Sequence, residues 1–399
     1  MWWSPGRVGT VKLKCYTVGE SSRLGTCFSD GLGDLIPWEQ RAVGQKQFRE
    51  ETGGNGMKAL VLTAYHRLEV LEVPEPVLGP EDVLVRVHCC GICGSDVHGL
   101  DGSTGRRRPP VIMGHEAAGA IARLGSAVEG WTVGQAVTFD STIWCGRCPP
   151  CRQGLWNLCD HRRVLGVSCE EYRQDGAFAE YVAVPQHILY RLPEGVSFEQ
   201  AALVEPLAVA MHAVRQIPLR VGDRAVVIGA GMVGLLAVQV LRQAGCSRIW
   251  TVDVDAGRLE LACQLGADEG FRPDQIDVPA EIRHRTEGRG ADVVLEVVGV
   301  GPTVGLAVEV VRKGGYISLV GNVLPEVPLA LQKVVTRQVR LQGICASCGE
   351  YPACLEMIGQ GRIRVEPLLS AVAPLEEGPE WFTRLYRREP GLLKVLLRP

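Results

Sequence analysis

The spacing of hydrophobic residues changes along the chain and predicts two kinds of domain. Short runs that alternate hydrophobic and polar residues, at 57–62, 82–87 and 179–184, predict β-strands with one buried face. Gly and Pro separate these runs at short intervals, as in an all-β unit. We therefore expect a β domain in this part of the chain.

From about residue 201, helical runs alternate with short, continuously apolar runs. Strands buried on both faces have this composition, and their alternation with helices predicts a parallel sheet covered on both sides. After about residue 341 the elements are mixed again. The predicted fold class is α/β, and the runs that predict the parallel strands are 225–228, 249–252, 293–296 and 316–320.

Residues 1–56 follow neither period and end in the glycine-rich run 53–56. The segment contains several acids, unlike a transit peptide, and it lacks the apolar stretch of a secretory signal. Met57 then opens a regular strand pattern. We interpret residues 1–56 as an N-terminal extension, either a disordered leader or an over-extended start, with a functional arm as the alternative.

The composition is that of an ordinary folded protein, and 399 residues allow two or three domains. A formal charge of -3 provides no basic field for nucleic acid, and no apolar run is long enough to span a membrane. The odd number of cysteines, 15, argues against a framework of disulfides alone and indicates reduced thiols, some available for metal. We therefore expect a cytoplasmic protein with neither nucleic-acid nor membrane partners.

A Gly-x-Gly-x-x-Gly run joins the apolar run 225–228 to a helical run. Gly229 permits a tight turn, Gly231 lets the backbone approach a pyrophosphate, and Gly234 lets the helix pack on the strand. Asp253 ends the next apolar run, where an acid binds the ribose hydroxyls and repels a 2′-phosphate. The pattern predicts an NAD site; the alternative is a turn of glycines beside a surface acid.

Four cysteines lie close together in a loop with Gly and Pro. Four thiolates suit tetrahedral zinc, and a closed shell leaves no position for substrate, so we expect a structural zinc. A zinc-ribbon nucleic-acid module would need a basic face with stacking aromatics, and an iron–sulfur motif often has Pro after its last cysteine, where this chain has Asp160. The predicted ligands are Cys145, Cys148, Cys151 and Cys159.

A second group of metal-binding residue types is dispersed along the chain. It consists of Cys93, the pair His115-Glu116, and Glu205. A cysteine, a histidine and a carboxylate with a water make an open zinc site that can bind substrate. Taken singly, these residues also suit a buried thiol, a loop histidine and a helix-start acid, and spacing alone leaves both interpretations open.

Together these motifs resemble the zinc-dependent medium-chain dehydrogenase family over residues 57–399. The resemblance implies a GroES-like β domain, 57–208 and 341–399, with a Rossmann domain of doubly wound parallel sheet, 209–340, inserted in it. The motifs that carry it are GICGSDVH (91–98), GHE (114–116), the four-cysteine loop, DGAFAEYV (175–182), EPLAVAMHA (205–213) and GAGMVG (229–234).

The resemblance also implies roles for the dispersed residues. Cys93 and His115 would bind a catalytic zinc, with Glu116 as a third ligand or an exchanging one. Glu205 stands where the alcohol-type branch has a cysteine, which resembles the polyol and butanediol branch. Asp96 would hydrogen-bond His115 from outside the ligand shell and fix its tautomer.

Proton transfer and cofactor contacts follow from the same resemblance. Ser95 and His98 would carry the alcohol proton to solvent while the substrate carbon gives hydride to the nicotinamide; a turn serine and a surface histidine are the alternatives. Arg258 resembles the family's arginine beside the adenosine. The remaining cofactor-lining positions would be Val233, Val320 and Gly321.

Two departures from sorbitol dehydrogenases bear on the substrate. Sorbitol dehydrogenases have a pocket tyrosine where this chain has Gly99, and an aromatic–arginine pair where it has Cys345 and Ala346, so sorbitol itself is in doubt. Threonine dehydrogenases share the complete four-cysteine loop. The run 106–108, three arginines, could meet a substrate anion, but we interpret it as a solvated loop.

The predicted function is the transfer of hydride from a secondary alcohol or polyol to NAD, as in sorbitol (L-iditol) dehydrogenases, with one catalytic and one structural zinc per subunit. The alternatives are an L-threonine 3-dehydrogenase, a butanediol dehydrogenase, or a non-catalytic nucleotide-binding protein, which would not need a proton relay. Relatives suggest a homodimer or homotetramer. The remaining cysteines have no predicted role, and we interpret Cys89, Cys90 and Cys345 as small buried thiols.

Overall fold

The structure, a computed structural model, describes residues 56–169 and 172–399. The interpretation of residues 1–56 as an extension concerns residues outside this part, apart from Gly56. The first strand, β1 (Gly56–Ala64), begins one residue before the predicted start at Met57. Its alternating pattern buries the side chains of Met57 and Ala59 and exposes that of Lys58, as the sequence predicted.

The predicted β domain is built around two sheets. In the smaller one, β1 lies between β2 (Arg67–Pro74) and β4 (Val111–Ile112). In the larger one the strand order is β10-β6-β5-β3-β18-β17, with β9 also paired to β3. The strands of the larger sheet are β3 (Asp82–Gly91), β5 (Glu116–Leu124), β6 (Ala136–Phe139), β9 (Tyr181–Pro185), β10 (Leu189–Arg191), β17 (Leu369–Pro374) and β18 (Lys394–Arg398).

The end of the chain returns to the β domain. Strand β18 pairs antiparallel with β3, so that Leu397 lies opposite Cys90. The core beside this pair contains Phe139, Phe178 and Phe382, all fully buried. Strands β17 and β18 therefore join a sheet whose other strands all precede the parallel sheet in the chain.

The second part of the fold is a six-stranded parallel sheet of order β13-β12-β11-β14-β15-β16. Numbered by their order in the chain, its strands run 3-2-1-4-5-6, the order of the doubly wound dinucleotide-binding fold. The α/β prediction is therefore confirmed. The strands are β11 (Arg224–Ile228), β12 (Arg248–Val252), β13 (Glu269–Phe271), β14 (Ala291–Glu296), β15 (Val311–Leu319) and β16 (Arg340–Gly343).

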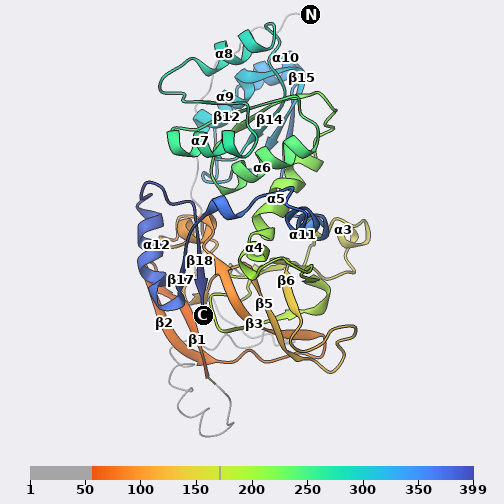
Figure 1. The fold of residues 1–399 in the computed structure, drawn as a ribbon, viewed down its shortest axis with the longest axis vertical. Coiled ribbons are helices and arrows are strands. Elements are labelled where there is room, and N and C mark those ends of the chain that lie inside the picture. Colours follow the sequence, from red (N-terminus) through yellow and green to blue (C-terminus); the bar gives the residue numbers. More distant parts are fainter. Residues whose placement is uncertain (1–55, 170–171) are drawn as a thin grey trace, which may run out of the picture. The chain divides into compact units, whose positions relative to one another are not determined.

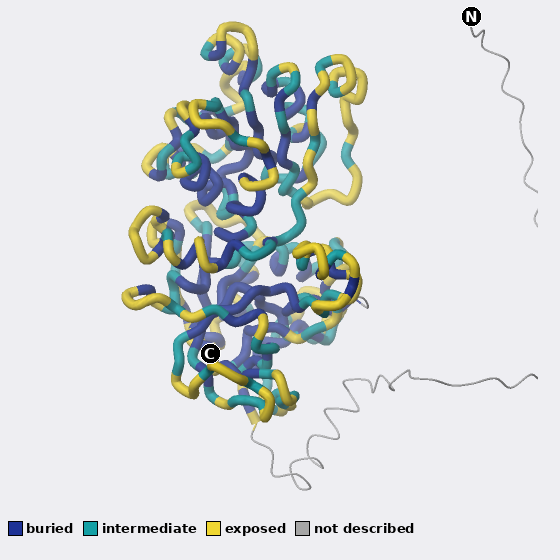
Figure 2. The backbone as a smooth tube through the Cα atoms, turned by 90° about the vertical axis from the view of Figure 1, so that its right-hand side faces the viewer, coloured by how far each residue is buried: buried dark blue, intermediate teal, exposed yellow. Residues whose placement is uncertain are grey.

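Helices cover both faces of this sheet (Figure 1). Alternate residues of β11 point to opposite faces: Val227 packs with Leu235 of α6, and Val226 packs with Ile282 of α8. The inner strands are accordingly buried and much of the connecting loops exposed, whereas the edge strand β16 has no buried residue (Figure 2). The helices of this part are α6 (Met232–Gln243), α7 (Ala256–Gln264), α8 (Val278–Arg285), α9 (Gly301–Val310) and α10 (Leu331–Thr336).

The expected domain limits fall inside elements. Helix α5 (Val204–Arg215) crosses the expected limit near 208, and strand β16 runs past the one at 340. The limits themselves stay predictions.

Among the described residues, no helix is both long and apolar enough to cross a membrane. The other helices are α2 (Gly94–Gly99), α3 (Pro149–Arg152), η1 (Trp156–Leu158), η3 (Gln186–Ile188), α4 (Phe198–Ala202), α11 (Tyr351–Gly359), η4 (Glu366–Leu368), η5 (Leu375–Glu377) and α12 (Gly378–Tyr386), and a short pair joins β7 (Thr142–Ile143) to β8 (Arg163–Val164).

Candidate metal centres and cofactor site

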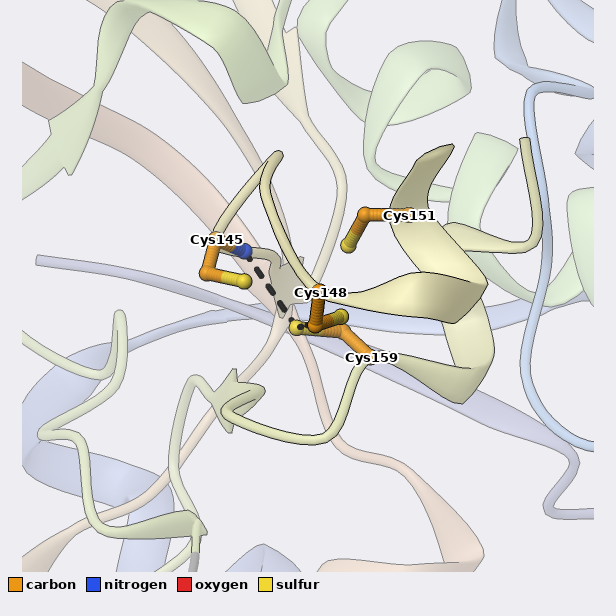
Figure 3. Close-up of side chains that lie close together, drawn as sticks. All are labelled: Cys145, Cys148, Cys151 and Cys159. Atoms are coloured by element: carbon orange, nitrogen blue, oxygen red, sulfur yellow. Dashed lines mark hydrogen bonds between the residues drawn. The ribbon is translucent and has the colours of Figure 1, made fainter. Parts of the chain in front are cut away.

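Four cysteine side chains of one loop converge (Figure 3). Cys145 precedes α3, Cys148 and Cys151 lie at its start and within it, and Cys159 follows η1. All four sulfur atoms lie within 4.8 Å of one another, and the sulfurs of Cys148 and Cys159 are 3.8 Å apart. The structure therefore brings together the four residues that were predicted to bind a structural zinc.

Backbone N–H groups of the loop donate hydrogen bonds to the sulfurs of Cys145 and Cys159. Backbone amides of Arg147 and Cys148 lower the pKa of the Cys145 thiol to about 6. The backbone N–H groups of Cys145 and His161 donate to Cys159 Sγ at 3.3 and 3.4 Å. Burial raises the pKa of Cys151 to about 12 and that of Cys159 above its usual value. Because zinc is bound by thiolates, a closed tetrahedral zinc at these four sulfurs would release protons on binding.

A second group of possible ligands lies where β3 and β5 meet. The ligand atoms of Cys93, His115 and Glu116 lie within 4.8 Å of one another. Cys93 follows the end of β3, Glu116 begins β5, and Gly91 is paired with Glu116 across the two strands. A Cβ on Gly91 would lie 2.3 Å from Glu116 Oε2, so the carboxylate requires a glycine there. A thiol, an imidazole and a carboxylate fit zinc with an open position.

Asp96 is completely buried beside this cluster. Its Oδ2 accepts a hydrogen bond from the Cys93 backbone N–H at 3.3 Å, and its Oδ1 lies 3.5 Å from Nδ1 of His115. Burial opposes ionisation of Asp96, but the charges of His115 and Arg107 outweigh it and hold the pKa of Asp96 well below its usual range. The structure thus places a carboxylate where it can orient His115, which was the role expected of it.

Glu116 has a buried partner that the sequence did not indicate. Lys394, on β18, lies with its Nζ 2.5 Å from Glu116 Oε2 and 3.0 Å from the carbonyl oxygen of Ile92. Both side chains of the pair are at most 3% exposed. Removal of one member would leave an uncompensated charge in the protein interior. A single lysine in an apolar C-terminal strand is the only sequence signal for this contact.

Glu205 lies near the cluster but outside the group of donor atoms within 4.8 Å. It is in the first turn of α5, and its Oε1 accepts a hydrogen bond from Ser141 Oγ at 3.2 Å. Burial raises the pKa of Glu205. The charge of His115 lowers this pKa, and the charge of Glu116 raises it further. Of the two carboxylates predicted as ligands, Glu116 is the one grouped with Cys93 and His115.

The interpretation of residues 106–108 as a solvated loop is wrong for Arg107. Its side chain is 4% exposed, whereas Arg106 and Arg108 are exposed. One nitrogen of its guanidinium, Nη2, donates to Asp96 Oδ1 at 2.8 Å and to Ser95 Oγ at 3.1 Å. Spacing could not distinguish this arginine from its neighbours, because the partners become adjacent only in the fold.

Ser95 and His98 lie on the short helix α2, three residues apart, which places them on one side of the helix. Both side chains are partly exposed. The backbone oxygen of His98 accepts a hydrogen bond from Ser103 Oγ at 3.2 Å. The predicted relay residues are therefore next to Cys93, which caps this helix, and the relay itself stays a prediction.

The glycine run forms the turn between β11 and α6. Gly229 has φ +103°, a conformation that favours glycine, and a Cβ on Gly234 would lie 1.8 Å from the carbonyl oxygen of Gly229. Gly231 caps α6, has open space beside it, and is followed by Val233 in the first turn. This arrangement fits a pyrophosphate at the helix N-terminus.

The other predicted cofactor residues lie near the same edge of the sheet. Asp253 follows β12, and its two oxygens accept hydrogen bonds from the backbone N–H groups of Ala230 (2.7 Å) and Asp255 (2.9 Å). The backbone N–H groups of Val320 and Gly321, after β15, both donate to the Glu296 carbonyl. Arg258 differs, because its guanidinium reaches the Leu392 carbonyl at 3.4 Å. The carboxyl ends of β11, β12 and β15 thus carry these residues, as a nucleotide site requires.

The cysteines without a predicted role are free thiols wherever the structure describes them. Cys89 and Cys90 are fully buried, in agreement with their interpretation. Cys345 is partly exposed, and its sulfur accepts a hydrogen bond from Arg162 Nη1 at 2.9 Å. The expectation of a small buried thiol is therefore wrong for Cys345.

Comparisons with known proteins agree with this architecture. Residues 79–194 match the alcohol dehydrogenase GroES-like domain, and residues 232–360 match the zinc-binding dehydrogenase domain. The chain is 34% identical to D-xylulose reductase A of Aspergillus oryzae (81% of this chain, 92% of the other) and 33% identical to a sorbitol dehydrogenase of Bacillus subtilis (86% and 97%). A structure from Sinorhizobium meliloti 1021, assigned as a zinc-binding dehydrogenase and bound to NADP, matches with a TM-score of 0.79 and 33% identity (86% and 100%).

Proposed function

The chain belongs to the family of zinc-binding alcohol dehydrogenases, and on this basis we propose that it oxidises a secondary alcohol of a polyol with NAD. The observation that carries the proposal is the cluster of Cys93, His115 and Glu116, whose donor atoms lie within 4.8 Å of one another. Beside it are a buried orienting carboxylate, Asp96, and a hydroxyl for proton transfer, Ser95. A protein that only binds nucleotides needs none of these groups.

The two metal clusters are proposed to have different tasks. The four thiols of the cysteine loop would hold a structural zinc, because a closed shell leaves no position for substrate. Cys93, His115 and Glu116 would hold a catalytic zinc, with Glu205 beside it rather than in the shell. Zinc there would act as a Lewis acid on the substrate hydroxyl, and NAD would accept the hydride.

The residues of the chain position the reactants and move the proton. Ser95 Oγ, held by Arg107, takes the proton of the substrate hydroxyl, and His98, partly exposed on the same helix, passes it towards water. Asp96 keeps the His115 imidazole in place through the geometry at Nδ1. The turn at Gly229 to Gly234 binds the cofactor pyrophosphate and so places the nicotinamide.

Asp253 supports NAD rather than NADP as the cofactor. An acid after the second strand of the sheet accepts hydrogen bonds from the ribose hydroxyls and repels a 2′-phosphate. The backbone amides that bind its two oxygens fix the carboxylate in this place. The solved relative from S. meliloti binds NADP, so the preference has to be tested on this chain.

The substrate is proposed to be a polyol. The D-xylulose reductase and sorbitol dehydrogenase relatives support this class. Gly99 and Ala346 occupy the positions of two expected sorbitol contacts, so we expect sorbitol itself to be a poor substrate. L-threonine and 2,3-butanediol are the alternatives within the same chemistry.

The proposal is tested by following nicotinamide absorbance with a panel of polyols, L-threonine, 2,3-butanediol, gulonate and sugar phosphates, each with NAD and with NADP. D-xylulose with NADH tests the reverse direction. We expect turnover of a polyol, with kcat/KM at least tenfold higher for NAD. Binding of NAD without turnover of any member of the panel would contradict the proposal and favour a non-catalytic nucleotide-binding protein.

We further propose that the enzyme acts in the cytoplasm as a homodimer or homotetramer. Free thiols throughout the described part suit a reducing compartment. The edge strand β16 of the parallel sheet leaves backbone groups that a second copy could pair. Light scattering of the purified protein measures the number of subunits, and a monomer would contradict the proposal.

A further inference from the structure

Arg107 connects two residues of the proposed catalytic site. Its Nη2 lies 2.8 Å from Asp96 Oδ1 and 3.1 Å from Ser95 Oγ. We propose that Arg107 is a positioning residue that ties Asp96 to Ser95 and so sets both the imidazole of His115 and the hydroxyl of the proton relay. The inference rests on the proposed function, because it assigns Arg107 to that same site.

The loop that carries Arg107 is fixed on both sides by Ser168. The Ser168 hydroxyl accepts a hydrogen bond from the Arg108 backbone N–H at 2.5 Å and donates to the Arg108 carbonyl at 2.8 Å. The Ser168 backbone N–H donates to the Arg106 carbonyl at 3.0 Å. With the neighbouring residues held, the backbone at Arg107 directs its side chain inward while the side chains of Arg106 and Arg108 are exposed.

Space for the guanidinium stem comes from a glycine. A Cβ on Gly99 would lie 2.8 Å from Cγ and 3.0 Å from Cβ of Arg107, which is closer than such contacts allow. A side chain at position 99 would therefore displace the Arg107 stem from the place that it occupies in this structure.

The guanidinium alters what Asp96 can do for His115. Asp96 Oδ2 is used by the Cys93 backbone N–H, and Oδ1 is shared between Arg107 at 2.8 Å and His115 Nδ1 at 3.5 Å. A carboxylate that receives an imidazole N–H makes the ring a more basic metal ligand. Arg107 is the nearer partner and fixes Asp96 Oδ1 opposite His115 Nδ1, so that loss of the guanidinium would free the carboxylate to leave the position from which it orients the ring.

At Ser95 the same nitrogen fixes the direction of the hydroxyl. The Arg107 N–H uses one of the two acceptor lone pairs of Ser95 Oγ. The other lone pair is left to accept the substrate proton, and the serine's own hydrogen is left to be donated onward. Without this contact the Ser95 hydroxyl would rotate freely and would lose that freedom on adopting the same orientation.

The test compares Arg107→Met and Arg107→Lys with Arg106→Met, a control on the same loop whose side chain is exposed. The main readout is the rate at which a chelator removes zinc from the Cys93 cluster. Zinc is assigned to this cluster by comparison with Cys93→Ala, which lacks it. The second readout is the visible spectrum after cobalt replaces zinc at that cluster alone. Neither readout depends on turnover.

We expect Arg107→Met to release this zinc about 10- to 100-fold faster than Arg106→Met, with a shifted cobalt spectrum. Arg107→Lys keeps a charge but cannot present the same planar fork, so we expect partial recovery of both readouts. A release rate and a cobalt spectrum in Arg107→Met equal to those of Arg106→Met would overturn the proposal.

If Arg107→Met fails to fold, because the Asp96 charge is left buried alone, the pair Asp96→Asn/Arg107→Met removes both charges and takes its place. Faster zinc release from this folded double variant than from Asp96→Asn alone supports the proposal, and release at the rate of Asp96→Asn overturns it. The readouts also separate this inference from the proposed function. A wild type without turnover on any alcohol contradicts the function, whereas unaltered metal release in an active enzyme contradicts only the role of Arg107.

Discussion

The two clusters of metal-binding side chains in this chain differ in where their residues come from. The cysteine loop supplies all four of its sulfurs from residues 145–159. In the other cluster, Cys93 is the N-cap of α2, just after β3, His115 directly precedes β5 and Glu116 begins β5. The first therefore needs little more than a local loop, and the second exists only after two strands have paired.

The surroundings of the clusters differ as well. Around the Cys93 cluster lie the buried charges of Asp96, from the adjoining helix, of Arg107, from the following loop, and of Lys394, from the last strand. Such groups are costly to bury and are kept only where each has a partner. The thiols of the loop are instead stabilised by nearby backbone N–H groups. This difference supports the proposal that the loop would hold a metal for stability and the second cluster a metal for chemistry.

The largest expected effect is the loss of turnover in Cys93→Ala. Loss of this ligand removes Lewis-acid assistance worth several kcal/mol, so kcat/KM should fall by about a thousandfold or more. The chain should stay folded, with a melting temperature within a few degrees of the wild type. Cys246→Ala, which truncates a buried thiol of the parallel-sheet domain, is the control and should retain turnover. Unchanged turnover in Cys93→Ala would contradict the assignment.

Glu116→Gln and Glu205→Gln decide which carboxylate belongs to the zinc shell. Glu116→Gln should lower zinc affinity by about 100-fold and, by leaving Lys394 unpaired, reduce the free energy of unfolding by about 3–5 kcal/mol. The double variant Glu116→Gln/Lys394→Met should recover stability but not zinc. Glu205→Gln should keep its zinc, because Glu205 lies outside the group of donor atoms. Zinc loss in Glu205→Gln but not in Glu116→Gln would reverse the two roles.

Cys145→Ser tests the closed cluster. Removal of one thiolate should cost the structural zinc and lower the free energy of unfolding by several kcal/mol, because metal binding at such a site contributes directly to folding. Turnover per zinc at the Cys93 cluster should change by less than about twofold in the chains that remain folded. Denaturant titration and metal analysis measure the two quantities. A variant that is fully stable but slow would show that the loop acts in catalysis.

The smallest expected effect concerns a buried carboxyl on the segment between the two clusters. Burial raises the pKa of Asp140 to about 7 from 3.8, against a hydrogen bond from the Thr142 backbone N–H at 2.8 Å. The folded chain thus holds a proton that the unfolded chain releases, so this contribution to stability is present below about pH 4 and is lost as the pH rises through 7. Asp140→Asn should remove that loss.

We therefore expect Asp140→Asn to match the wild type at pH 4 and to exceed it at pH 8 by a few kcal/mol at most. Unfolding by urea at several pH values measures the difference. Asp274→Asn, which removes an exposed carboxyl with a lowered pKa, should show no such gain at pH 8. A constant difference between Asp140→Asn and the wild type across this range would contradict the prediction.

What the sequence could predict depended on how local each feature is. The cysteine loop, the glycine turn at Gly229 and the buried strands each occupy a short stretch of the chain. The spacing of residues within such a stretch is enough to predict its local structure. The family resemblance added Cys93, His115 and Glu116 as a set, which spacing alone had left open. The structure then placed Glu116 rather than Glu205 with the other two donors.

Arg107 and Lys394 were missed for a physical reason. Asp96, the partner of Arg107, lies on the other side of a loop, and Glu116, the partner of Lys394, is distant in the sequence. Without a visible partner, a basic residue is more often exposed to solvent. Only the fold shows that both are buried beside the same cluster. The glycine at position 99 was noted as a missing contact, and the structure shows that the arginine stem uses its space.

The most direct test of this account is stepwise removal of zinc from the wild-type enzyme, with turnover and melting temperature followed together. We predict two zinc ions per chain. Removal of the first, from the Cys93 cluster, should abolish reduction of NAD while the melting temperature stays nearly constant, and added zinc should restore turnover. Removal of the second should unfold the chain. A zinc-free chain that still oxidised its alcohol at the full rate would contradict the account.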